Sequence, residues 1–275
     1  MSVTQTQERR NSNGIIVLSL GGSLLVPDQQ GPRVDFIVQF VRLIIAEQQR
    51  WRKVVIVCGG GRTARTYIDG ARSVLREMGV LPAVDNPRWV ADQHWLGIHA
   101  TRENAHLMRT IFRHAGNHAF YRVLKNPHQV PLEALQSDRR VVLAAGWKPG
   151  WSTDYVAARM AGVFGARTIV NLTNVDRIYD RDPKLDGAQP LQEVSWEEYF
   201  SKFPRTKFEP GDNTPFDPVA AGFAADHGMR VIVFKGSNLK DLKGFLGGGP
   251  YVDRFRGTVI GGTARTANGS VEVRA

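Results

Sequence analysis

Residues 54–65, with the sequence VVIVCGGGRTAR, decide the fold. A run of apolar, mostly β-branched residues ends at Cys58 and passes directly into three glycines. Beyond them, apolar residues recur at helical spacing up to Gly79, which suits a helix end. A strand, a glycine turn and a helix in this order form the repeating unit of a parallel α/β sheet. The apolar residues share one face of the expected helix: Ala64, Tyr67, Ile68, Ala71, Val74, Leu75 and Met78.

The same alternation continues along the chain. Further strands are predicted at 15–20, 141–145, 168–172 and 231–234, with weaker candidates at 120–123 and 258–260. Between them, residues 37–45 carry an apolar helical face, Asp154 has the position of an N-terminal cap, and Ser195 with Glu198 has capping-box spacing. The sequence therefore predicts an α/β fold of three layers, α/β/α, with a mostly parallel central sheet.

The composition is typical of a globular protein with a large core, since 42% of the 275 residues are hydrophobic and 23% are charged. No apolar run has membrane-spanning length and the polar leader lacks a signal-peptide pattern, so we expect a cytoplasmic protein. We expect one domain over 15–260, with lobes of roughly 15–146 and 147–260, between a flexible leader (1–14) and a polar tail (261–275). The single cysteine, Cys58, excludes an internal disulfide and is best read as a small buried hydrophobe.

The chain is strongly basic, with 36 lysines and arginines against 26 acidic residues and a formal net charge of +10. Such an excess suits nucleic acid, an anionic membrane surface or phosphorylated small molecules. The basic residues are scattered and form no stripe, which argues against nucleic acid as a partner. The charge alone does not choose among the remaining partners, and most of these residues are expected on a solvated surface.

Five predicted strands run directly into a glycine-rich or polar segment. The carboxyl ends of parallel strands meet at one sheet edge, where such folds bind ligands, so these segments should line one cleft. Glycines let the backbone approach a ligand, and a following helix offers free N–H groups to an anion, which suits phosphate. Arg62 and Arg65 follow the second glycine turn and are candidate charge partners. The five segments are 21–23, 59–62, 146–150, 173–176 and 235–237.

Several familiar motifs are missing from the sequence. It contains no P-loop, no G-x-G-x-x-G after the first strand and no G-x-S-x-G turn, which argues against a Walker kinase, a Rossmann dehydrogenase and a nucleophile elbow. His94, His99 and His106 lie close together but lack the spacing of zinc ligands. No metal centre held by the protein alone is expected.

Carboxylates and aromatic residues near the strand ends have two interpretations each. The residues 152–154, Ser-Thr-Asp, can hold an anion or position a cation, or they can simply cap a helix. Trp147 and Trp151 flank a lysine and can stack on a base or pack in the core. Four further aspartates suit magnesium or nucleotide hydroxyls, or turns and caps: Asp176, Asp180, Asp182 and Asp217.

Seven motifs occur together in an order that matches one known family. They are VLSLGGSLLVPD (17–28), VIVCGGGRTARTY (55–67), WLGIHATRENAHL (95–107), AAGWKPGWSTDYVAA (144–158), IVNLTNVDRIYDRDPK (169–184), PGDNTPFDPVAAGFA (210–224) and GTVI (257–260). With them the chain resembles the amino acid kinase family, closest to its archaeal-type uridylate kinase branch. The resemblance extends from about Ile15 to Ile260.

The resemblance implies an enzyme that transfers the γ-phosphoryl group of Mg-ATP to UMP, and a homo-oligomer, usually a hexamer. The lobe 15–146 would be the acceptor side and 147–260 the ATP side. Implied ATP-binding residues are Gly22, Ser23, Gly61, Arg65, Thr173, Tyr179 and Asp182. Implied UMP-binding residues are Gly60, Arg62, His94, Trp147, Lys148, Pro149, Gly150, Trp151, Ser152 and Thr153. Implied catalytic residues are Asp154 and Asp217, which would orient the cations, together with Lys148.

Two positions depart from the pattern of the family. Many members carry a lysine two residues before the first glycine pair, where this chain has Ser19. Our hypothesis is that Lys148, Lys235 or Arg62 supplies the missing positive charge. His94 stands where relatives often have an aspartate that contacts the UMP ribose, although this chain has an aspartate at position 92.

Other functions remain open from the sequence. A second enzyme of the same family would use a carboxylate or a small phosphate as acceptor. A non-catalytic nucleotide sensor or oxyanion-storage protein is also consistent with the serine at position 19. Release of ADP from Mg-ATP in the presence of UMP separates the kinase from both.

Overall fold

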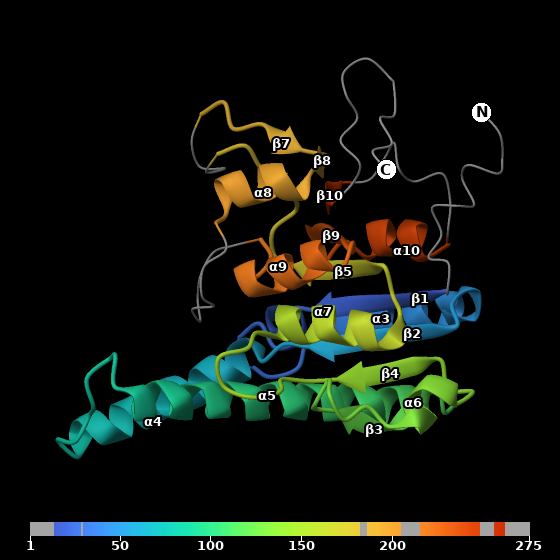
Figure 1. Cartoon of the computed structure of the whole chain (residues 1–275). Helices are drawn as coiled ribbons and strands as arrows, with labels where there is room; N and C mark the ends of the chain where they lie inside the picture. The colour runs from blue at the N-terminus through green and yellow to red at the C-terminus, as the bar shows by residue number, and fades with distance from the viewer. Residues whose placement is uncertain (1–13, 29, 182–185, 205–214, 248–255, 262–275) are drawn as a thin grey trace.

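The computed structural model describes residues 14–28, 30–181, 186–204, 215–247 and 256–261. At its centre is an eight-stranded sheet in the order β3-β4-β2-β1-β5-β9-β10-β8 (Figure 1). Its strands are β1 (Ile15–Leu20), β2 (Lys53–Cys58), β3 (Ala119–Leu124), β4 (Val141–Ala144), β5 (Thr168–Thr173), β8 (Glu193–Val194), β9 (Arg230–Lys235) and β10 (Gly257–Ile260). The short strands β6 (Ile178–Tyr179) and β7 (Pro190–Leu191) form a separate antiparallel pair.

The pairing of the described strands is mostly parallel. Six neighbouring pairs run parallel, and β9 with β10 runs antiparallel. The predicted α/β class and mostly parallel sheet are therefore confirmed. Because β1, β2, β4, β5 and β9 all run in the same direction, their carboxyl ends lie along one edge of the sheet.

Helices cover both faces of the sheet, as the three-layer prediction requires (Figure 1). They are α2 (Gly22–Leu25), α3 (Val34–Glu47), α4 (Gly61–Glu77), α5 (Pro87–His114), α6 (Leu132–Gln136), α7 (Thr153–Phe164), α8 (Trp196–Lys202), α9 (Pro218–Asp226) and α10 (Leu239–Gly247), with a 3-10 turn at Gln48–Arg50. Every residue of β1 is buried, and its side chains alternate between two cores. Val17 packs into the core under α7 and α9, whereas Leu18 packs into the core under α3 and α10.

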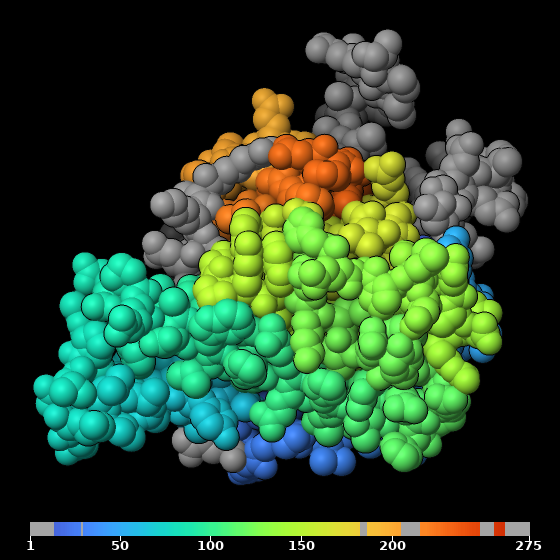
Figure 2. Space-filling view, turned by 60° about the horizontal axis from the view of Figure 1, so that its bottom comes forward, coloured from blue at the N-terminus to red at the C-terminus, as the bar shows by residue number. Residues whose placement is uncertain are grey.

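The hairpin of α4 and α5 reaches beyond the edge of the sheet (Figure 1), and it forms a protrusion in the space-filling view (Figure 2). The apolar residues of α4 share a face as predicted, but this helix has no buried residue. Tyr67, Val74 and Met78 are 61%, 59% and 67% exposed. The reason is geometric: α4 packs mainly on α5, and no core layer reaches its outer side.

The predicted helix ends agree with the structure in two cases and differ in one. Ser195 and Glu198 form the expected capping box, and Gly79 follows the end of α4 at φ +69. The cap of α7 is Ser152, whose Oγ accepts the backbone N–H three residues ahead at 3.0 Å. The expectation that Asp154 is this cap is wrong. Asp154 lies in the first turn of α7, and its carboxylate accepts a hydrogen bond from Ser19.

Two further features bear on the class of protein. Cys58 is fully buried at the end of β2, as expected, and burial raises the pKa of its thiol to about 12. Within the part of the chain that the structure describes, no helix combines the length and apolar character needed to cross a membrane.

Candidate functional site

The glycine loops after β1 and β2 touch each other at the carboxyl edge of the sheet. Gly59 N donates to Leu20 O at 2.9 Å. A Cβ placed on Gly22 would lie 2.5 Å from the carbonyl carbon of Gly59 and 2.6 Å from that of Gly60, so only glycine fits. Gly61 begins α4 at φ +63, a conformation in which L side chains are strained. The two turns predicted to bind phosphate are therefore in direct contact.

The ends of β5 and β9 complete the same edge. Gly236 N donates to Thr173 O at 2.7 Å, which joins the loops after these two strands. Asn174 Nδ2 donates to Ser23 Oγ at 2.9 Å, which joins the loop after β5 to α2. Together with the loop after β4, the structure brings all five predicted segments to one edge.

A pair of aspartates lies beside these loops. Ser19 Oγ donates to Asp154 Oδ1 at 2.7 Å, and the backbone N–H of Asp217 approaches Asp154 Oδ2 at 3.4 Å. Asp217 Oδ1 accepts from Ala220 N at 2.7 Å and so caps α9. Its other oxygen, Oδ2, is buried and has no hydrogen-bond partner among the described residues.

Burial raises the pKa of both carboxyl groups. For Asp154, the hydrogen bonds from Ser19 and from the Asp217 backbone oppose this effect. For Asp217, burial raises the pKa to about 6, the Ala220 hydrogen bond opposes the shift, and the charge of Asp154 adds to it. Carboxylate oxygens are the hard ligands that Mg²⁺ prefers, and Asp217 Oδ2 has no partner in the described residues, so this pair fits a magnesium ion that arrives with a nucleotide. Within the described residues, no cluster of three or more His, Cys, Asp or Glu side chains could hold a metal alone.

The aromatic residues after β4 form a column. The rings of Trp147 and Trp151 are stacked with centroids 6.0 Å apart, and Trp151 stacks on Tyr155 at 4.1 Å. No base fits between Trp151 and Tyr155, because their rings are already in contact. Lys148 Nζ lies 4.4 Å from the centroid of the Trp147 ring. Packing thus accounts for Trp151, while Lys148 and Trp147 lie together at the end of the column.

The two arginines behind the second glycine turn differ in their surroundings. Arg62 lies at the start of α4; its backbone N–H donates to Val26 O at 2.8 Å, and its Nε is buried with no partner in the described part of the chain. Arg65, one turn further, is exposed. Lys235 is also exposed, at the end of β9.

Residues expected near the nucleosides lie on separate elements. Tyr179, in β6, has its hydroxyl 3.4 Å from the carboxylate oxygens of Asp176. Asp180 accepts from Gln189 N at 2.8 Å, which supports the turn interpretation for this residue. Asp182 lies outside the described residues. His94, in α5, is half-buried, and burial lowers the pKa of its imidazole.

Helix α5 supplies site residues that the sequence analysis missed. Thr101, Arg102 and Asn104 bond to the backbone of the loops after β2 and β4. The sequence does contain signals for this helix. Asn86 caps α5 and Pro87 is its first residue. Apolar residues also recur on its buried face: Ile98, Ala105, Met108 and Phe112.

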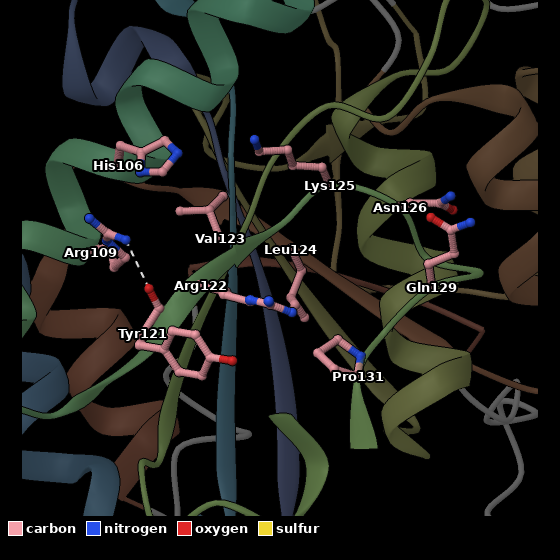
Figure 3. A pocket seen from close by; sticks show the side chains of 10 residues that line it. All are labelled: His106, Arg109, Tyr121, Arg122, Val123, Leu124, Lys125, Asn126, Gln129 and Pro131. Atoms are coloured by element: carbon pink, nitrogen blue, oxygen red, sulfur yellow. Dashed lines mark hydrogen bonds between the residues drawn. The ribbon is translucent and has the colours of Figure 1, made fainter. Parts of the chain in front are cut away.

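A separate pocket of about 360 Å³ lies between α5 and the edge strand β3 (Figure 3). Four basic side chains line it, and Arg109 donates from Nη1 to Tyr121 O at 2.8 Å. None of the predicted site residues belongs to this pocket. The basic lining residues are His106, Arg109, Arg122 and Lys125.

The fold and the site define an α/β protein with glycine loops suited to phosphate at the carboxyl edge of its sheet and a carboxylate pair beside them. The chain belongs to the amino acid kinase family, whose model matches residues 14–235.

The chain is similar to archaeal proteins named uridylate kinase. The one from Thermoplasma acidophilum is 32% identical over 249 residues, which cover 88% of this chain and 96% of that protein. The one from Methanospirillum hungatei is 33% identical, covering 89% and 94%. A solved structure of uridylate kinase from Archaeoglobus fulgidus superposes with a TM-score of 0.68 at 29% identity, covering 89% of this chain and 99% of that one.

Proposed function

We propose that this protein transfers the γ-phosphoryl group of ATP to UMP, giving ADP and UDP. A phosphate oxygen of UMP forms a bond to the γ-phosphorus, and the bond from that phosphorus to the β–γ bridging oxygen breaks. The observation that carries the proposal is the contact between two glycine loops beside a buried carboxylate pair. It is supported by relatives named uridylate kinase at about 30% identity over most of the chain.

The donor side of the site would hold ATP. The loop after β1 and the start of α4 offer backbone N–H groups to the phosphates, with Arg65 as an exposed cation nearby. The ends of β5 and β6 would contact the nucleoside. The residues proposed for this side are Gly22, Ser23, Gly61, Arg65, Thr173, Tyr179 and Asp182.

The acceptor side would hold UMP. Arg62 is suited to its phosphate because the buried Nε of this side chain has no partner in the described residues. The loop after β4 would line the rest of the pocket, with Lys148 and Trp147 side by side on it. The residues proposed for this side are Gly60, Arg62, His94 and the segment 147–153.

Asp154 and Asp217 would orient magnesium that enters with ATP. When bound, this ion neutralises charge on the phosphates and aligns them. Ser19 keeps the Asp154 carboxylate in place through a 2.7 Å hydrogen bond. Phosphoryl transfer needs two anions held in line under positive charge, with little covalent chemistry by the protein. Since Ser19 brings no charge, we propose that Lys148, Lys235 or Arg62 supplies it.

We further propose that the chain forms a homo-oligomer, a hexamer by resemblance to its family, in the cytoplasm, and that it is one domain with an acceptor lobe and an ATP lobe. The exposed apolar side chains on the α4–α5 hairpin support self-association. Its exposed residues are Tyr67, Val74, Met78, Val80, Leu81, Val84 and Trp95.

A coupled assay of ADP release tests the function. Mg-ATP is offered with UMP, CMP, dUMP, AMP, and small carboxylate and phosphate acceptors. We expect turnover with UMP well above that with every other acceptor. Turnover with a carboxylate alone, or nucleotide binding without ADP release, would contradict the proposal.

A further inference from the structure

One turn of α5 bonds to both loops on the acceptor side. Asn104, which is 3% exposed, donates from Nδ2 to Gly59 O at 2.8 Å and to Gly60 O at 3.1 Å. Thr101 Oγ1 accepts from Gly146 N at 2.8 Å and donates to the backbone of its own helix. A Cβ on Gly146 would lie 2.8 Å from this hydroxyl, so the loop lies flat against α5. The helix therefore contacts the carboxyl ends of β2 and β4 at once.

Arg102 lies in the same turn of α5, and its charged guanidinium also donates to the loop after β4. Its Nε donates to Gly146 O at 3.3 Å and its Nη2 donates to Trp147 O at 3.0 Å. Among the described residues it forms no ion pair with a carboxylate. The half-buried guanidinium is thus solvated by loop carbonyls, and its removal would leave both carbonyls without this donor.

The loop that Arg102 holds is packed by its tryptophan rings, and its backbone is fixed at the two ends. Gly150 has φ +85 and no neighbour that a Cβ would meet within 4 Å, so the middle of the loop faces open space. Its far end is fixed where Ser152 caps α7. Among the described residues, the backbone at the near end is hydrogen-bonded by the side chains of Thr101 and Arg102, and the bond to the Trp147 carbonyl comes from Arg102.

We propose that Arg102 is a positioning residue for the acceptor: it holds the Gly146–Trp147 backbone against α5 so that the loop presents a formed UMP pocket. Asn104 holds the Gly59–Gly60 backbone on the same turn, which fixes the two acceptor loops relative to each other. Arg102 acts through these carbonyls and needs no contact with UMP. This inference rests on the proposed function.

Steady-state kinetics of Arg102→Met and Arg102→Lys test the proposal. We expect Arg102→Met to raise the KM for UMP about tenfold or more, because a charged donor to two carbonyls is lost, with the KM for ATP changed less than about threefold. Arg102→Lys keeps a cationic donor that can reach one carbonyl. Its KM for UMP should therefore lie between the KM of the wild type and that of Arg102→Met. The Kd for UMP, measured by calorimetric titration without ATP, should increase in the same order, from wild type through Arg102→Lys to Arg102→Met.

Arg109→Met is the matched control. Arg109 is on the same helix and also donates to a backbone carbonyl, that of Tyr121, but away from the acceptor loops. The variant Arg109→Met should leave the KM for UMP unchanged. Equal KM values for UMP in wild type and Arg102→Lys, or equal increases in the KM for UMP and ATP, would overturn the inference even if Arg102→Met does not fold. Failure of the wild type to bind or phosphorylate UMP would instead contradict the proposed function.

Discussion

Gly22 is the residue on which the contact between the two glycine loops depends. A side chain there would run into the backbone of Gly59, Gly60 and Gly61, which cannot move without displacing β2 or α4. We expect Gly22→Ala to lower the free energy of unfolding by several kcal/mol, about 2–4, and to abolish ADP release. Denaturant titration and the coupled assay measure the two effects.

Gly162→Ala is the matched control for this change. Gly162 lies in α7, and a Cβ there meets only ordinary contacts with Phe223 and Met229. Alanine has the better helix propensity, so stability should stay equal or rise by about 0.5–1 kcal/mol. A Gly22→Ala protein as stable and active as Gly162→Ala would show that the loops do not need to touch.

The cation that replaces the family lysine can be identified by substitution. Lys148 lies over the Trp147 ring and Lys235 is exposed at the end of β9, both on the loops of the site. We expect at least one of Lys148→Ala and Lys235→Ala to lower kcat about tenfold or more, because positive charge over the moving phosphoryl group stabilises the transition state. Lys240→Ala, on the surface of α10, is the control. Unchanged kcat in both site variants would leave Arg62 as the remaining candidate.

At the scale of elements, Lys53 joins β2 to the segment between α6 and β4. It is 2% exposed, and its Nζ donates to Ser137 O, Ser137 Oγ and Arg139 O at 2.5, 3.1 and 2.8 Å. Burial lowers its pKa from 10.5 to about 8, and the charge of Arg52 adds to this. Above pH 8 the folded protein loses this proton before the unfolded chain does, so unfolding takes up a proton and stability rises with pH.

Lys53→Met removes this dependence. Between pH 8 and about pH 10, the free energy of unfolding of the wild type should increase relative to the variant by on the order of 1–3 kcal/mol. The variant itself should be less stable, by about 1–3 kcal/mol, because the carbonyls of Ser137 and Arg139 lose their donor. Denaturant titrations at several pH values measure the stability of both proteins and its change with pH. If the two free energies of unfolding changed in parallel with pH, the predicted role of Lys53 would be wrong.

The strands were predictable and the long helices were less so, for physical reasons. A strand buried on both faces, such as β1, is apolar at nearly every position and therefore stands out. In α5, polar residues such as Thr101 and Asn104 are buried because they bond to loops, which interrupts the apolar period. In α4 the apolar residues do recur at helical spacing, but the face they form is exposed to solvent in the single chain.

At the scale of the whole molecule, this exposed surface predicts self-association. Light scattering after size exclusion should give an oligomeric mass for the wild type. Val74→Glu in α4 and Met78→Glu at its C-cap place two charges where both residues are more than half exposed. This double variant should lower that mass while leaving the circular dichroism spectrum unchanged. A monomeric wild type would contradict the proposed oligomer.

The site was predictable where it depends on strand ends and not where it depends on tertiary pairing. Parallel strands bring their following loops to one edge, so the five segments could be placed together from order alone. The hydrogen bond between Ser19 and Asp154 joins residues 135 positions apart, and nothing in the local sequence announces it. Asp217 differs, because its cap on Ala220 is local and was among the predicted roles, while the role of its unpartnered Oδ2 as a cation ligand stays a prediction.

The most direct test of the central claim is product identification by ³¹P NMR. The protein is incubated with Mg-ATP and an equal amount of UMP, and the phosphorus signals are followed over time. The account predicts that UMP and ATP decrease together while the two signals of UDP and those of ADP appear in equal amounts, up to an equilibrium mixture, with no inorganic phosphate. Accumulation of inorganic phosphate with UMP unchanged, or no change in either nucleotide, would contradict it.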